Sequence, residues 1–229
     1  MTLLVKICGL TTPEALDAAI AAGADMAGLV VFPPSPRHLD PADGRALAAR
    51  AKGRLQTVAL TVDADDALLD EIVAALDPDM LQLHGKETPE RVAAVKARFG
   101  RPVVKALAIA EAADLARVPA YAAVADRVLF DARPPKGATR PGGLGQAFDW
   151  TLLAGLDAGL PYMLSGGLGP DNVAEALRIT RAPAVDVSSG VERAPGDKDP
   201  QKIVDFVRAA RAAAAAAPAQ PDRAALPLP

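Results

Sequence analysis

The chain of 229 residues contains one cysteine, Cys8, and only two histidines. A single thiol excludes a disulfide framework within the chain and any zinc site that needs several cysteines. His38 and His84 have no partner at the spacing of metal ligands, so we expect no metal site.

The sequence also lacks strongly apolar runs of eighteen or more residues, and its N-terminus has no basic segment followed by an apolar stretch. We therefore expect no membrane span and no secretory signal, and we predict a cytoplasmic protein. The formal net charge is only −3, and the basic residues are scattered along the chain. This distribution argues against a nucleic-acid partner and favours a small molecule.

Aromatic residues make up 3% of the chain, whereas apolar residues as a whole make up 51%. The core must therefore be filled by Ala, Val, Leu and Ile, as tightly layered α/β proteins allow. Short β-rich runs recur eight times, each followed by a turn and a helical stretch. The expected strands are residues 4–8, 26–32, 56–62, 80–84, 102–108, 127–131, 162–165 and 184–187.

Between these runs, apolar residues recur at intervals of three and four, which is typical of helices with one buried face. The stripes are Leu68, Leu69, Ile72, Val73 and Leu76; Val92, Val95 and Phe99; and Ile203, Val207 and Ala210. Thr12 and Thr88 each precede a proline and a glutamate. That pattern predicts a helix N-cap, then proline at the first helical position and a carboxylate in the first turn.

Strands that alternate with helices require right-handed parallel crossovers, and eight such units close most simply into a barrel. We therefore predict an α/β protein with a single-domain (β/α)8 TIM barrel over residues 1–217. Residues 218–229 have no apolar periodicity and are expected to form a disordered tail. A doubly wound open sheet is the alternative, but the Gly-x-Gly-x-x-Gly turn expected after its first strand is missing.

The first candidate for chemistry is Cys8, because the active site of a (β/α)8 barrel lies at the C-terminal ends of its strands. The first expected strand ends in Lys6-Ile7-Cys8, and alternation puts Lys6 and Cys8 on the same face. A lone cysteine is most often an inert buried residue. Here the strand-end position favours a functional thiol, whose pKa a charge on Lys6 could lower.

The second candidate is Asp131, which ends the sixth expected strand and therefore lies across the barrel mouth from Cys8. An aspartate that only caps the next loop is the alternative. Two groups of different pKa that face one another can move protons at two atoms of one substrate. The two strand ends therefore predict a proton-transfer pair of Cys8 and Asp131.

Glycine-rich turns follow the seventh and eighth expected strands, with Ser-Gly-Gly-Leu-Gly at residues 165–169 and Ser-Ser-Gly at residues 188–190. Backbone N–H groups in such turns bind phosphate, and barrels of this kind commonly bind one there. One glycine-rich turn alone would be weak evidence, but two at adjacent strand ends strengthen it. We predict a phosphorylated small-molecule substrate.

Two further side chains are candidates for binding. Arg37 ends a proline-rich loop after the second expected strand, and its planar guanidinium suits a carboxylate. An ordinary exposed loop arginine is the alternative. His84 ends the fourth expected strand, where it would either orient a substrate or satisfy a local backbone hydrogen bond, and the residues alone leave both open.

These motifs together resemble the phosphoribosylanthranilate isomerase family of tryptophan biosynthesis. The matching segments occur in family order from about residue 4 to residue 207, and their combination is far more specific than any one of them. They are Lys-Ile-Cys-Gly at 6–9, Val-Phe-Pro-Pro-Ser-Pro-Arg at 31–37, Leu-Gln-Leu-His-Gly at 81–85, Phe-Asp at 130–131, Phe-Asp-Trp at 148–150, Leu-Ser-Gly-Gly-Leu at 164–168 and Asp-Val-Ser-Ser-Gly-Val-Glu at 186–192.

The resemblance implies that Cys8 is the general base, Asp131 the general acid and Arg37 the partner of the anthranilate carboxylate. The implied phosphate cradle consists of Gly166, Gly167, Ser188, Ser189 and Gly190. Asp186 would lie near the ribose hydroxyls, and His84 and Lys6 are the other candidates for orienting the substrate. The implied enzyme is a monomer or homodimer.

The implied reaction is the Amadori rearrangement of N-(5'-phosphoribosyl)anthranilate to 1-(2-carboxyphenylamino)-1-deoxyribulose 5-phosphate. It needs no cofactor, because the protonated imine itself withdraws electrons from C2'. One departure from the family pattern is Gly143-Leu144-Gly145, where the family usually has Gly-Thr-Gly. Both glycines remain, so the loop can keep its path, but a hydroxyl is lost and a change in loop order or substrate affinity is expected.

Two other functions compete with this one. A related sugar-phosphate isomerase of histidine biosynthesis would normally carry a carboxylate in place of Cys8 and a phosphate site in each half, but only one such site is found. A catalytically silent phosphosugar-binding barrel would serve as a partner or regulatory subunit. The presence of both Cys8 and Asp131 argues against a silent barrel.

Overall fold

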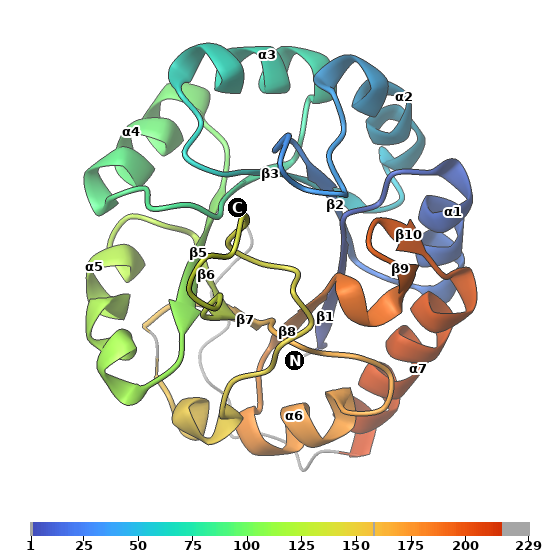
Figure 1. Cartoon of the computed structure of the whole chain (residues 1–229), viewed down its shortest axis with the longest axis vertical. Coiled ribbons are helices and arrows are strands. Elements are labelled where there is room, and N and C mark those ends of the chain that lie inside the picture. The colour runs from blue at the N-terminus through green and yellow to red at the C-terminus, as the bar shows by residue number, and fades with distance from the viewer. Residues whose placement is uncertain (1, 158, 217–229) are drawn as a thin grey trace.

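The computed structural model describes residues 2–157 and 159–216. Eight parallel strands close into a barrel in chain order, which confirms the predicted (β/α)8 fold and shows that the open sheet is wrong (Figure 1). The strands are β1 (Leu4–Cys8), β2 (Met26–Val30), β3 (Gln56–Thr61), β4 (Met80–Leu83), β5 (Val103–Ile109), β6 (Arg127–Ala132), β7 (Tyr162–Leu164) and β8 (Ala184–Val187). Pairing of β1 with β8, which places Lys6 opposite Asp186, closes the ring.

A ring of helices surrounds the barrel (Figure 1). The α-helices are α1 (Pro13–Ala22), α2 (Pro41–Ala51), α3 (Asp66–Leu76), α4 (Pro89–Phe99), α5 (Val118–Ala122), α6 (Val173–Thr180) and α7 (Pro200–Ala216). The predicted starts of α1 and α4 are confirmed: the Thr12 hydroxyl accepts the backbone N–H of Ala15, and the Thr88 hydroxyl accepts that of Arg91. The predicted stripes supply the buried faces of α3, α4 and α7.

Two of the eight units differ from the expected helical stretch. After β5 the chain forms the 3-10 helix η1 (Ala112–Arg117) and only five residues of α5, and after β6 it forms only the 3-10 helix η2 (Trp150–Leu153). Between β6 and η2, prolines and glycines interrupt any helix, because proline lacks an N–H donor and glycine is too permissive. Residues 133–149 therefore form a long loop, which we call the mouth loop. It crosses in front of the barrel in Figure 1.

The barrel interior is built in layers, as in other (β/α)8 proteins. One buried apolar cluster consists of Met26, Val58, Met80, Val104, Ala106, Leu129, Met163 and Ala184. A smaller cluster of Cys8, Val30 and Leu60 lies separately. Buried polar residues at interior strand positions near the C-terminal strand ends include Lys6, Gln82, Asp131 and Asp186. This polar set is unusual for a core and lies where the strands approach their functional ends.

Strand limits agree with prediction at β1 and β8 and differ by one or two residues elsewhere. Phe32, Val62, His84 and Ser165 were expected inside strands but lie just beyond them. After β8 the chain forms the 3-10 helix η3 (Ser189–Val191). A short antiparallel hairpin of β9 (Glu192–Ala194) and β10 (Asp197–Lys198) follows. The expected tail at residues 218–229 lies outside the described residues. Within the described part of the chain, no helix is long and apolar enough to span a membrane.

Candidate active site

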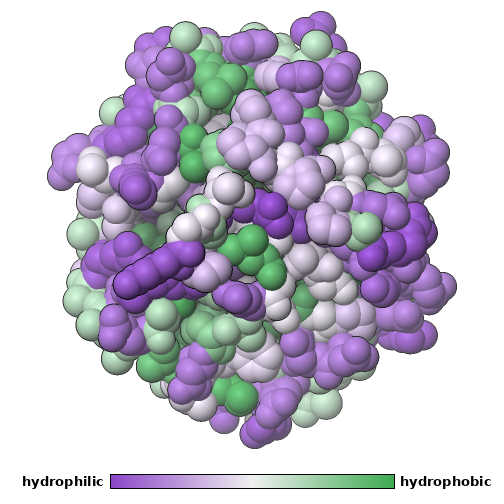
Figure 2. Space-filling view, in the orientation of Figure 1, coloured by the Kyte–Doolittle hydropathy of each residue, from purple (hydrophilic) through white to green (hydrophobic). Residues whose placement is uncertain are grey.

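A pocket opens at the C-terminal ends of the strands, under the mouth loop, with about 780 Å3 of free space that is partly open to solvent. Most of the predicted site residues line it: Cys8, Arg37, His84, Asp131, Gly166, Gly167, Asp186, Ser188 and Ser189. Lys6 and Gly190 do not belong to the lining. Figure 2 shows the same face, where hydrophilic residues surround a small apolar patch near the centre.

Cys8 lies directly above a buried ion pair. Lys6 is fully buried, and its Nζ donates to Asp186 Oδ1 at 2.9 Å. The other carboxylate oxygen of Asp186 accepts from Ser165 Oγ at 3.4 Å. Gly28 makes room for this group, since a Cβ there would lie 2.8 Å from Cys8 Sγ and 3.1 Å from Lys6 Nζ. Lys6 is therefore placed to act on the thiol from below and does not itself reach the pocket.

The charges around Cys8 oppose one another. Burial raises the pKa of the Cys8 thiol, and the positive charge of Lys6 lowers it by less than burial raises it. Lys6 therefore acts on the thiol pKa in the expected direction, but burial outweighs its effect. Burial lowers the pKa of Lys6, but the negative charges of Asp186 and Cys8 outweigh burial and raise it. Lys6 stays cationic, so a thiolate at Cys8 would form beside a fixed positive charge.

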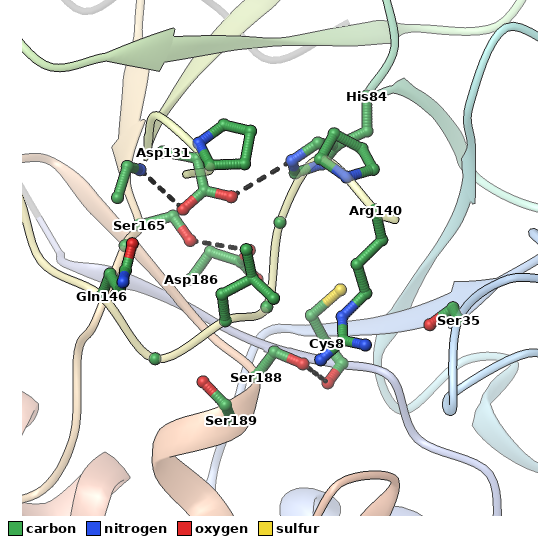
Figure 3. Close-up of a pocket in the computed structure, with 18 of the residues that line it drawn as sticks. Cys8, Ser35, His84, Asp131, Arg140, Gln146, Ser165, Asp186, Ser188 and Ser189 are labelled. Carbon is green, nitrogen blue, oxygen red and sulfur yellow. Dashed lines mark hydrogen bonds and ion pairs between the residues drawn. The ribbon is translucent and has the colours of Figure 1, made fainter. Parts of the chain in front are cut away.

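Asp131 occupies the opposite side of the pocket, together with His84 (Figure 3). Its Oδ1 accepts the backbone N–H of Ala132 at 2.9 Å, and its Oδ2 lies 3.2 Å from His84 Nε2. Only 6% of Asp131 is exposed. The mouth loop covers it closely, because a Cβ at Gly142 would lie 2.5 Å from Asp131 Oδ2 and 2.9 Å from His84 Nε2. Glycine at position 142 lets the loop approach the carboxylate.

Arg37 lies in the pocket wall, but two of its guanidinium nitrogens already donate to the carboxylate of Glu192. Its Nε and Nη2 donate to the two carboxylate oxygens of Glu192, both at 2.7 Å, and Nη2 also donates to Gly143 O at 3.2 Å. Lys198 donates to Glu192 as well, at 2.7 Å. Burial raises the pKa of Glu192, but its hydrogen bond from Arg37 and the charge of Lys198 outweigh burial and lower it. Among the described residues, Nη1 is the guanidinium nitrogen without a partner.

We expect Arg37→Ala to raise KM by about tenfold or more, because one charge-assisted hydrogen bond to a substrate carboxylate contributes about 1.5 to 3 kcal/mol. It should also lower the free energy of unfolding, since it removes one cation from the buried Glu192. Steady-state kinetics and thermal unfolding measure the two effects. Arg50→Ala, at an exposed pair with Asp17, is the control and should change neither substantially. An unchanged KM for Arg37→Ala would exclude Arg37 from substrate binding.

The glycine turns lie where a phosphate cradle was predicted. Gly166 and Gly167 have φ values of 83° and 66°, and a Cβ would meet the backbone N of Ala132 at 2.7 Å and of Ala147 at 2.5 Å, respectively. Only glycine fits both the conformation and the contacts. Gly190 packs instead against Leu168, whose carbonyl oxygen would lie 1.9 Å from an added Cβ. Gly190 therefore packs against Leu168 outside the pocket lining, while Ser188 and Ser189 border the pocket.

The mouth loop adds residues to the pocket, and for two of them, Arg140 and Gln146, the sequence had predicted no role. Arg140, Gln146 and Leu144 line it from the mouth loop. The long loop carries no periodic signal that could have placed them, although a Pro-Gly-Gly run after Arg140 marked a close backbone approach. Leu144, which stands where the family usually has threonine, is half-buried in the lining. Across residues 2–157 and 159–216, no cluster of three or more histidine, cysteine or acidic side chains is placed to hold a metal.

A closed (β/α)8 barrel with a thiol, a carboxylate and a glycine-lined turn around one pocket at its strand ends defines a barrel enzyme that acts on a small molecule. Residues 5–209 match the family model described as N-(5'phosphoribosyl)anthranilate (PRA) isomerase. The chain belongs to this family and is an isomerase of tryptophan biosynthesis. The histidine-biosynthesis isomerase and the silent binding barrel are therefore not supported.

Individual relatives agree with the family model. An N-(5'-phosphoribosyl)anthranilate isomerase of Bradyrhizobium diazoefficiens is 67% identical over 212 residues, which cover 93% of this chain and 95% of that protein. Two solved structures each match with a TM-score of 0.81 and 31% identity, covering 92% of this chain and 100% of theirs. One is of monomers generated from the dimeric phosphoribosylanthranilate isomerase of Thermotoga maritima. The other is a phosphoribosylanthranilate isomerase in complex with reduced 1-(o-carboxyphenylamino)-1-deoxyribulose 5-phosphate.

Proposed function

We propose that this protein converts N-(5'-phosphoribosyl)anthranilate to 1-(2-carboxyphenylamino)-1-deoxyribulose 5-phosphate, with Cys8 as general base and Asp131 as general acid. The observation that carries the proposal is the arrangement of one pocket. A thiol and a carboxylate stand on opposite sides of it (Figure 3). The glycine turns follow β7 and β8, the two strands that lie between β6 and β1 in the closed barrel. The reaction needs one proton donor and one proton acceptor that reach different atoms of the same sugar.

The substrate is placed by its two anionic ends. We assign its phosphate to the turns of Gly166, Gly167, Ser188, Ser189 and Gly190, and its anthranilate carboxylate to Arg37 Nη1. The ribose then lies between Cys8 and Asp131, with Asp186 near its hydroxyls. The mouth loop reaches both ends: a Cβ at Gly143 would lie 2.4 Å from Arg37 Nη1, and one at Gly145 3.6 Å from Ser189 Oγ. A loop in this position excludes water from the reacting sugar.

In the first step Asp131, in its protonated form, donates to the furanose ring oxygen, and the ring opens to a Schiff base. The carboxylate that results accepts hydrogen bonds from the Ala132 N–H and from His84 Nε2, which stabilise its charge. In the second step the Cys8 thiolate removes the proton from C2', and the enolamine then ketonises. Lys6, held by Asp186, offsets the negative charge of the thiolate from below.

The proposed reaction uses no cofactor, because the protonated imine already withdraws electrons from C2'. We place the enzyme in the cytoplasm, as a monomer or homodimer. The dimeric state named for the Thermotoga maritima enzyme is one of these two alternatives.

The test is turnover by the purified protein. N-(5'-phosphoribosyl)anthranilate is generated in the cuvette, and the decrease in its fluorescence is followed after the protein is added. The expected result is a decay whose rate is proportional to protein concentration, with a product of unchanged mass. The phosphoribosyl-linked imidazole substrate of the histidine pathway should not be consumed. A decay that does not depend on the protein, or turnover of the imidazole substrate alone, would refute the proposal.

A further inference from the structure

Gln82 is a fully buried polar residue on β4, and it is hydrogen-bonded to His84 in the pocket lining. Its Nε2 lies 2.9 Å from His84 Nδ1. The ring's other nitrogen, Nε2, lies 3.2 Å from Asp131 Oδ2. Gln82, His84 and Asp131 thus form one hydrogen-bonded chain that runs from the barrel interior to the proposed general acid.

The direction of the hydrogen bonds defines the tautomer of His84. When Gln82 Nε2 donates to Nδ1, that nitrogen carries no proton, so a neutral ring carries its proton on Nε2. The Nε2–H then donates to Asp131 Oδ2, while the Ala132 N–H donates to Oδ1. Both carboxylate oxygens accept, which is the arrangement suited to an ionised Asp131. The observed hydrogen-bonded chain from Gln82 to Asp131 therefore corresponds to Asp131 after it has given up its proton.

When this hydrogen-bonded chain gains a proton, His84 Nδ1 requires a different partner. If His84 gains a second proton, Nδ1–H must donate, and Gln82 Nε2 cannot accept. The carbonyl oxygen of the same amide can, and Gln82 Oε1 is a buried atom without a hydrogen-bond partner among the described residues. A half-turn of the amide would bring Oε1 to Nδ1–H. One side chain therefore serves both protonation states of the ring.

A role in packing alone does not explain glutamine at this position. The neighbouring apolar cluster in the barrel interior includes Met26, Met80 and Met163, which are similar in length to glutamine and carry no group that needs a hydrogen bond. An unsatisfied amide oxygen in the barrel interior disfavours the fold, and methionine would avoid it. The orphaned oxygen is thus better explained by a second state in which it is used.

We infer that Gln82 is a positioning residue that holds His84 in either protonation state and, through His84, determines when Asp131 carries its proton. This inference rests on the proposed role of Asp131 as the general acid. Other charged groups also face the two cavities that adjoin His84. They are Arg37 after β2, Asp63 after β3, Lys86 after β4, Lys105 on β5, Arg117 after β5, Arg133 and Arg140 in the mouth loop, and Asp186 on β8. The variants below leave all of these unchanged.

Two substitutions of Gln82 should shift the pH profile of kcat in opposite directions. Gln82→Met removes the acceptor for Nδ1–H, so the protonated chain is disfavoured and the basic limb, where the acid loses its proton, should move to lower pH. Gln82→Glu adds an acceptor and a negative charge, so the same limb should move to higher pH. We expect Gln82→Met to lower kcat by about tenfold, less than loss of the acid itself, with KM nearly unchanged.

Gln56→Met is the matched control, because Gln56 is an exposed glutamine at the start of neighbouring β3. It should leave kcat and the pH profile unchanged. A purely structural role for Gln82 predicts lower activity in both variants without opposed shifts. Shifts in the same direction, or none, would overturn the inference.

The tautomer of His84 can be measured without turnover, by ring 1H–15N correlation spectra of the protein labelled with 15N-histidine. His38 is the internal reference, because its Nδ1 accepts the Phe32 N–H at 3.1 Å. In the sequence, His38 is far from position 82, where the substitutions are made. Wild-type His84 should carry Nε2–H when neutral, and Gln82→Glu should shift the proton to Nδ1. The same spectrum for His84 in all variants would refute the inference. If the wild type shows no turnover but the tautomer shifts as expected, the proposed function fails and the role of Gln82 toward His84 stands.

Discussion

Replacement of Cys8 by serine is expected to lower kcat by about 10²-fold or more. Serine is close to cysteine in size, so the space left by Gly28 and the Lys6–Asp186 pair beneath should be preserved. Its hydroxyl, however, has a far higher pKa than a thiol and cannot supply the anion that removes the C2' proton. The loss should appear in single-turnover measurements as slow chemistry.

The same Cys8→Ser protein supplies the control through its binding. Cys8 is assigned to neither the phosphate nor the carboxylate of the substrate. Affinity for reduced 1-(o-carboxyphenylamino)-1-deoxyribulose 5-phosphate, the reduced product analogue, should therefore stay within a few-fold of the wild type. Turnover near the wild-type rate would remove Cys8 from the mechanism. A parallel loss of analogue binding would show that the substitution had damaged the pocket as a whole.

Replacement of Asp131 by asparagine is expected to cause a similar loss of about 10²-fold or more in kcat. The amide oxygen can still accept from His84 Nε2–H, although the amide NH2 then faces the Ala132 N–H and that hydrogen bond is lost. The amide has no acidic proton to give to the ring oxygen, so ring opening should become the slow step. Pre-steady-state fluorescence of the bound substrate should therefore persist in the variant.

Asp126→Asn is the matched control for this substitution. Asp126 precedes β6 at the opposite end of the barrel, where it accepts from the Val103 N–H and from Lys96. The change is chemically the same and should alter stability more than kcat. Equal losses of kcat at both positions would indicate a general disturbance of β6, and near-normal turnover in Asp131→Asn would exclude Asp131 as the acid.

The fold was predictable because its signals are local. Most strands are short, mainly apolar runs buried on both faces. The starts of α1 and α4 are encoded by a threonine, a proline and a glutamate in sequence. The units after β5 and β6 were less predictable. There the helix is reduced to short 3-10 and five-residue segments, which carry too few residues to show a helical periodicity.

The site was predictable where the strand ends alone determine it. Cys8, Asp131 and the glycine turns after β7 and β8 reach the pocket because parallel strands in a barrel end at the same rim. Arg37 was placed correctly in the pocket wall, but its pairing with Glu192 joins residues 155 positions apart and leaves no trace in local sequence. The chain from Gln82 to Asp131 was likewise hidden, because only the closed barrel sets β4 and β6 around one interior.

The central claim, that Cys8 is the catalytic base at the barrel mouth, is tested most directly by alkylation of the folded enzyme with iodoacetamide. Because Cys8 is the only cysteine, mass spectrometry and residual activity report on the same position. Burial raises the pKa of this thiol, so the rate of labelling should keep rising above the pH at which an ordinary cysteine is fully ionised. We predict one carboxamidomethyl group per chain, loss of activity in proportion to labelling, and protection by the reduced product analogue. Complete labelling of the folded protein with activity retained would contradict the account.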